Sequence, residues 1–82
     1  MKSLQHADGL PQNPSLFLNT IMARNGLKND AALSRFLKLA APQISKMRNN
    51  RMAVSASTLL QIHDRTEMPI ADLRTLLFSP TS

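Results

Sequence analysis

The chain has 82 residues, of which 43% are hydrophobic, and ten basic against five acidic residues give a formal charge of +5. This length allows one small domain with a thin core, and the hydrophobic content excludes a disordered chain. The absence of cysteine excludes disulfides and cysteine metal sites, and no apolar run approaches the roughly 20 residues that span a bilayer. We therefore expect a soluble cytoplasmic protein with no membrane partner.

The two ends of the chain lack hydrophobic periodicity. Residues 1–13 are polar, include Gly9 and Pro11, and are predicted to form a flexible N-terminal arm. Residues 79–82 form a short polar tail. Residues 14–78 contain five helical patterns joined by short connections and no convincing strand. This organisation predicts an all-α fold, a compact five-helix bundle.

The first two helices are delimited by capping signals. Pro14 suits the first turn of a helix, and Gly26 suits the position just beyond its end. Asn29 is a favourable N-cap for the second helix, followed by Asp30 in the first turn. The expected apolar positions of the first helix are Leu16, Phe17 and Ile21, with Leu18 as a further candidate. Those of the second helix are Ala32, Leu33, Phe36 and Leu37.

Proline and serine residues delimit the remaining three helices. Pro42 must lie in a first turn, so the third helix begins at about Ala41 and turns Ile44 and Met47 inward. Ser55 or Ser57 caps the fourth helix, which residues 66–69 end, and the fifth runs from about Ile70 to Phe78. The expected apolar positions are Leu59, Leu60, Ile62 and His63 in the fourth helix, and Ile70, Leu73, Leu76 and Leu77 in the fifth.

The excess positive charge is confined to one segment. Residues 24–51 hold seven basic residues and a single acid, Asp30, a net charge of +6, whereas the remainder of the chain sums to −1. Such a local field suits a polyanion, although a solvated face without a partner would also carry it. Within this segment about three residues, Lys38 to Ala40, separate the second helix from the third. That spacing is typical of a helix-turn-helix.

The outward face of the third helix has the side chains that a DNA major groove requires. Gln43 can bond to adenine, Lys46 can reach guanine, and Ala41 and Pro42 can contact a thymine methyl group. The residues expected to contact phosphate are Lys28, Asn29, Arg48, Asn49, Asn50 and Arg51. Each of these residues could also be an ordinary solvated, C-terminal or turn residue. Their combination with the turn spacing and the confined charge favours DNA binding.

The stretch "NDAALSRFLKLAAPQISKMRNNR", followed by a helix and then "MPIADLRTLL", resembles the lambda-repressor-like helix-turn-helix family, which includes the Cro and phage repressor proteins. The resemblance covers about residues 16–77 and implies a five-helix fold whose third helix enters the major groove. It puts base-reading positions on Ala40, Ala41, Pro42, Gln43 and Lys46, and a phosphate-clamping amide on Asn49.

The chain departs from the family pattern at three positions. The glutamine with which family members often read adenine is replaced by Ala41, and the glycine usual in the turn is replaced by Lys38. A glutamine that binds phosphate in the family is replaced by Asp30, whose charge should repel phosphate. The operators of known relatives therefore cannot be carried over.

Other chemistries find little support in the sequence. His6 and His63 are the only histidines, His63 and Asp64 point in different directions on one helix, and no nucleophile, phosphate-loop or metal motif is present. We expect no catalytic residue, no metal and no cofactor, and hence no enzyme. Only three phenylalanines are available for stacking, which argues against single-stranded nucleic acids.

The last helix is the expected protein-contact surface. Leu73, Leu76, Leu77 and Phe78 crowd it, and some should remain exposed beyond a thin core. We expect a homodimer through these residues that reads two DNA half-sites about 34 Å apart. The small size of the chain favours a repressor that occludes a promoter. The alternative is a helix-turn-helix-fold interaction module, an antitoxin or adaptor with a protein partner on this helix, in which DNA binding is secondary or absent.

Overall fold

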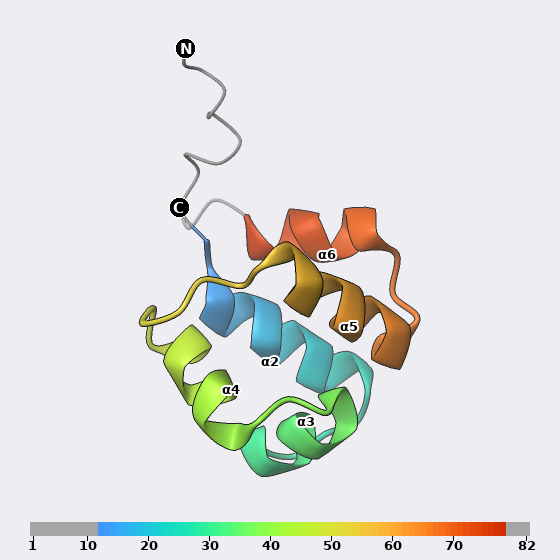
Figure 1. The fold of residues 1–82 in the computed structure, drawn as a ribbon. Coiled ribbons are helices and arrows are strands. Elements are labelled where there is room, and N and C mark those ends of the chain that lie inside the picture. Colours follow the sequence, from blue (N-terminus) through green and yellow to red (C-terminus); the bar gives the residue numbers. More distant parts are fainter. Residues whose placement is uncertain (1–11, 79–82) are drawn as a thin grey trace.

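A computed structural model describes residues 12–78 of the chain. Over these residues the chain forms five helices and no strand, which confirms the predicted all-α bundle (Figure 1). The helices are α2 (Pro14–Arg24), α3 (Asp30–Leu37), α4 (Ala41–Arg48), α5 (Ala56–Thr66) and α6 (Ile70–Leu77). In Figure 1, α2 crosses the middle of the molecule, with α3 and α4 below it and α6 above. The predicted tail, residues 79–82, and residues 1–11 of the predicted arm lie outside the described residues.

Side-chain caps mark the starts of α3 and α5. The Asn29 Oδ1 accepts a hydrogen bond of 2.8 Å from the Ala32 backbone N–H and starts α3 as predicted. Of the two serines considered for α5, Ser55 is the cap, and its Oγ accepts from the Thr58 N–H at 3.2 Å. These bonds satisfy backbone donors that the first turn of a helix leaves without partners.

Left-handed residues end three of the helices, and one further residue of this kind follows α2. Gly26 has φ 65° and follows the end of α2, as the sequence predicted. The other three are not glycines: Lys38 (φ 58°) after α3, Asn50 (φ 61°) after α4 and Glu67 (φ 62°) after α5. A side chain with a Cβ adopts this conformation at a cost, so Lys38 and Glu67 in particular are held there by the surrounding structure.

The core is a single cluster at the centre of the five helices. Ten side chains are fully buried: Phe17, Leu18, Ile21, Leu33, Leu37, Ile44, Met47, Ile62, Leu73 and Leu77. The inward orientation of Ile44 and Met47 is therefore as predicted. The predictions for Leu16 and Leu60 were wrong, because these side chains are 42% and 57% exposed. Both lie on helices whose opposite faces already fill the thin core.

Residues between the helices complete the core. Leu39 in the turn after α3, Val54 before α5 and Met68 between α5 and α6 are all at least nine-tenths buried. They lie outside the helical repeats, so helical periodicity gives no signal for them. The connections that contain these three residues therefore pack against the core.

The start of α2 is bonded to distant parts of the chain. The Asn13 N–H donates to the Leu77 carbonyl at 2.6 Å, which joins the first described residues to the end of α6. The Gln12 side chain accepts from the Val54 N–H at 2.8 Å and donates to the Val54 carbonyl at 3.1 Å. Residues 12 and 13, predicted as the end of a flexible arm, therefore belong to the folded domain.

Candidate nucleic-acid interface

The turn between α3 and α4 is held by hydrogen bonds from a third helix. Lys38 adopts the left-handed conformation, and the Leu39 N–H reaches back to the Ser34 carbonyl at 3.1 Å. From α5, the Gln61 Nε2 donates to the carbonyls of Leu37 and Lys38 at 2.9 and 2.7 Å. These bonds satisfy carbonyls that the end of a helix leaves without partners. The position of α4 relative to α3 is consequently tied to α5.

One face of α4 is buried and the other faces outward, as the sequence predicted. Ile44 and Met47 are fully buried. The expected base-contacting residues Ala41, Pro42 and Lys46 are exposed, and Gln43 is half-buried. All four lie within one short helix, so they can be presented together to a single groove.

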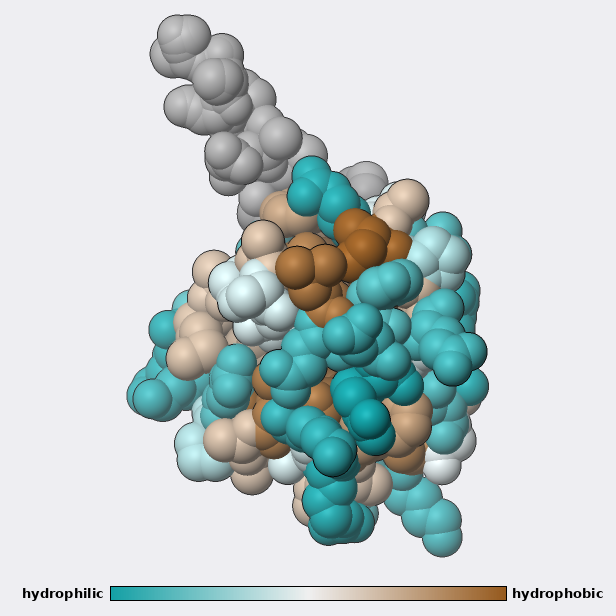
Figure 2. All heavy atoms as spheres, turned by 45° about the vertical axis from the view of Figure 1, so that its right-hand side comes forward, coloured by the Kyte–Doolittle hydropathy of each residue, from teal (hydrophilic) through white to brown (hydrophobic). Residues whose placement is uncertain are grey.

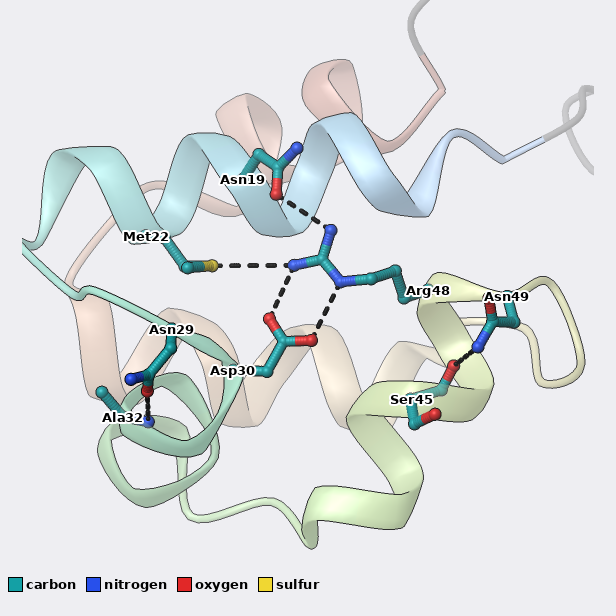
Figure 3. Close-up of polar contacts among 8 residues, drawn as sticks. All are labelled: Asn19, Met22, Asn29, Asp30, Ala32, Ser45, Arg48 and Asn49. Carbon is teal, nitrogen blue, oxygen red and sulfur yellow. Dashed lines mark hydrogen bonds and ion pairs between the residues drawn. The ribbon is translucent and has the colours of Figure 1, made fainter.

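The end of α4 has a compact cap that presents polar side chains. The Asn50 N–H donates to the Met47 carbonyl at 3.1 Å, and the Arg51 N–H donates to the Lys46 carbonyl at 2.7 Å. With Asn50 left-handed, these two bonds form a Schellman cap. The Asn49 Nδ2 donates to the Ser45 carbonyl at 3.0 Å (Figure 3).

A surface hollow of about 640 Å³ lies against the outward side of α4 and is lined by Pro42, Ser45, Lys46, Asn49 and Arg51. It brings expected base-contacting residues together with expected phosphate-contacting residues. Lys28 and Asn29, two further expected phosphate contacts, are exposed just before α3, and Asn50 is exposed after α4.

Arg48 lies differently from the other cations of the segment. Its Nε and Nη2 donate to the two Asp30 carboxylate oxygens at 3.0 and 2.8 Å, a two-pronged ion pair between α4 and α3 (Figure 3). Its Nη1 donates to the Asn19 Oδ1 on α2 at 2.9 Å, and Nη2 also lies 3.6 Å from the Met22 sulfur. The sequence reading assigned Arg48 to phosphate and did not detect this pair, because a separation of 18 residues carries no periodic signal.

The four residues expected to form a dimer contact fall into two classes. Leu73 and Leu77 are fully buried in the core, so a second copy of the chain cannot reach them in the folded state. Leu76 and Phe78 are half-buried, and the Arg74 guanidinium lies 5.8 Å from the centre of the Phe78 ring. Figure 2 brings forward the side where α5 connects to α6 and shows a small apolar patch among hydrophilic side chains.

Within residues 12–78 no group of three or more His, Asp or Glu side chains could hold a metal ion. None of the helices over the same residues is long and apolar enough to cross a bilayer. His63 is half-buried and donates from Nδ1 to the Met68 carbonyl at 2.6 Å, consistent with a packing role.

Comparison with protein families identifies the class of this domain. Residues 18–77 match the family of Cro/C1-type helix-turn-helix DNA-binding domains, and the chain belongs to that family. The resemblance inferred from the sequence is thereby confirmed, and DNA binding is the property that the family description names. Comparisons with curated proteins and with solved structures found no match.

Proposed function

We propose that this protein is a transcriptional regulator that recognises a specific sequence in duplex DNA and represses by occluding a promoter. The observation that carries the proposal is the outward side of α4, where Ala41, Pro42 and Lys46 are exposed and Gln43 is half-buried. Pro42 and Lys46 line the surface hollow together with Asn49 and Arg51. Forked amides, a cation and small apolar groups are the complement of base edges in a major groove. The confined charge of residues 24–51 supplies attraction to the phosphates.

The proposed base contacts are those four residues of α4. The proposed phosphate contacts are Lys28 and Asn29 before α3, and Asn49, Asn50 and Arg51 after α4. Repression requires only that the bound domain and RNA polymerase compete for the same stretch of DNA.

Selection of bound duplexes from a random pool at about 150 mM salt is the direct test. Enrichment of one sequence motif supports sequence-specific binding, and transcription from a promoter carrying that motif should fall as protein is added. Weak binding without enrichment, abolished by added salt, would leave only a basic surface and contradict the proposal. The interaction-module reading would then be tested by searching for a protein bound to α6.

We further propose that the protein binds DNA as a two-fold dimer through Leu76 of α6 and Phe78, the residue that follows α6. Apolar side chains that remain partly exposed at a helix end are suited to such a contact. The selected motif should then be an inverted repeat with half-sites about 34 Å apart. A monomer in light scattering at high micromolar concentration with DNA present would contradict the dimer.

A further inference from the structure

Arg48 connects three helices through one side chain. It extends from the last residue of α4 to Asp30 at the first residue of α3 and to Asn19 on α2. Its side chain is only 23% exposed, although it carries a full charge. A forked guanidinium fixes the direction as well as the distance of its partners, which a single-point contact does not. The pair therefore constrains the angle at which α4 leaves the helix-turn-helix.

The same bonds occupy four of the five guanidinium N–H donors of Arg48, counting the contact with the Met22 sulfur. All three guanidinium nitrogens of Arg48 donate within the domain, at 2.8 to 3.0 Å to Asp30 and Asn19. Arg51, three residues beyond the end of α4, instead lines the surface hollow beside Lys46. The two arginines, three positions apart, thus have different surroundings.

The ion pair also offsets the negative charge of Asp30 within the basic segment. Asp30 is the only acidic residue in residues 24–51 and follows Lys28 and Asn29, the proposed phosphate contacts. Its side chain is 44% exposed, so without a counter-charge the carboxylate would repel an approaching phosphate. With the Arg48 guanidinium 2.8 Å away, the pair is close to neutral as seen from the DNA.

We propose that Arg48, together with Asp30 and Asn19, is a positioning residue that sets the orientation of α4 on DNA and neutralises Asp30, and that it does not contact phosphate. This inference rests on the proposed DNA-binding function. It predicts that Arg48 and Arg51 act on different quantities: Arg48 on sequence discrimination, Arg51 on the dependence of affinity on salt.

Four variants separate these roles: Arg48→Lys, Arg48→Gln, Arg48→Gln combined with Asp30→Asn, and Arg51→Gln as the matched control. For each, affinity is measured from 50 to 200 mM salt on the selected duplex and on a scrambled one, with thermal unfolding in parallel. Arg48→Gln should lower the selected-to-scrambled ratio about tenfold or more and leave the salt slope unchanged. Arg51→Gln should keep the ratio and reduce the slope by about 0.9, the value for one lost phosphate contact.

Arg48→Lys and the double variant distinguish charge from geometry. Lysine keeps the charge but cannot bind both carboxylate oxygens in a fork, so Arg48→Lys should lose discrimination almost as Arg48→Gln does. The double variant removes the unpaired carboxylate and should regain affinity on both duplexes, because that charge repels the phosphates of any sequence, while the ratio stays low. The proposal is overturned if Arg48→Lys binds like the wild type while Arg48→Gln reduces the slope by about 0.9.

Failure of the underlying function would be recognised separately. If the wild-type protein itself shows no preference for any duplex, the proposed function fails. The pair is then tested by thermal unfolding alone, in which Arg48→Gln should melt lower than Arg51→Gln. Equal melting temperatures would overturn the positioning role. If Arg48→Gln does not fold, Arg48→Lys and the double variant still supply the comparison on DNA.

Discussion

At the scale of single residues, the proposed interface divides into groups that read bases and groups that hold phosphates. Lys46 and Gln43 lie on the outward face of α4, whereas Arg51 follows its Schellman cap. Base contacts determine which sequence is bound, and phosphate contacts determine how strongly any sequence is bound. Substitutions in the two groups should therefore differ in kind and not only in size.

Replacing Lys46 or Gln43 by alanine should change the preferred sequence and cost about 1–3 kcal/mol of binding free energy on the best site. Arg51→Ala should weaken all duplexes alike and reduce the salt slope by about one. Arg35→Ala is the control, because Arg35 is an exposed cation of the same segment to which no contact is assigned. Binding titrations on selected and scrambled duplexes measure both effects. Wild-type preference in both α4 variants would show that α4 is not the reading helix.

Single residues also show where sequence reasoning ended. The outward positions of α4 were predictable because Pro42 fixes the helix start, and Ile44 and Met47 then fix the buried face. The partner of Arg48 could not be predicted from the sequence, because its contact with Asp30 depends on how three helices cross. A cation in a basic segment looks the same in sequence whether it faces phosphate or a neighbouring carboxylate.

At the scale of helices, boundaries were predicted more closely than faces. Caps are local, so Asn29 marked the start of α3 without knowledge of the fold, whereas the sequence offered both Ser55 and Ser57 for α5 and the structure selects Ser55. Burial depends on neighbours, which explains the errors at Leu16 and Leu60. In a thin core each short helix contributes few inward positions, and an apolar residue beside them can face the solvent.

Glycine should relieve the backbone strain at the left-handed residues that end α3 and α5. Lys38 and Glu67 have φ of 58° and 62°, a conformation that costs a residue with a Cβ about 1–2 kcal/mol. Glycine removes that strain but loses more entropy on folding, about 0.5–1 kcal/mol. Lys38→Gly and Glu67→Gly should each raise the free energy of unfolding by about 0.5–1 kcal/mol.

Thermal or urea unfolding of the two single variants and the double variant checks this prediction. The two positions end different helices, so their effects should add. The two sites act as controls for each other, since only Lys38 belongs to the turn before α4. If Lys38→Gly destabilises while Glu67→Gly stabilises, the lysine side chain contributes more to the turn than its backbone conformation costs.

At the scale of the whole molecule, residues 12 and 13 connect the start of α2 to distant parts of the bundle. Gln12 bonds to both backbone groups of Val54, 42 positions away, and Asn13 bonds to the end of α6. Val54 is buried and belongs to the connection that follows Arg51. The family match covers residues 18–77, so Gln12 and Asn13 lie outside it while their partners, Val54 and Leu77, lie within it. The Gln12 bonds fix the loop after α4 from a segment that the family pattern does not include.

Gln12→Ala should therefore lower the stability of the whole domain and leave the base preference of α4 unchanged. Two hydrogen bonds to a mostly buried backbone are lost, at about 1 kcal/mol each, so the free energy of unfolding should fall by about 1–2 kcal/mol. Gln43→Ala is the matched control, expected to change stability by less than about 0.5 kcal/mol while changing sequence preference.

Urea unfolding and duplex selection on both variants measure the two quantities. Equal stability of the two variants would mean that the Gln12 bonds contribute nothing beyond those that water would make. A changed motif in Gln12→Ala would instead mean that the loop after α4 helps to set which bases are read.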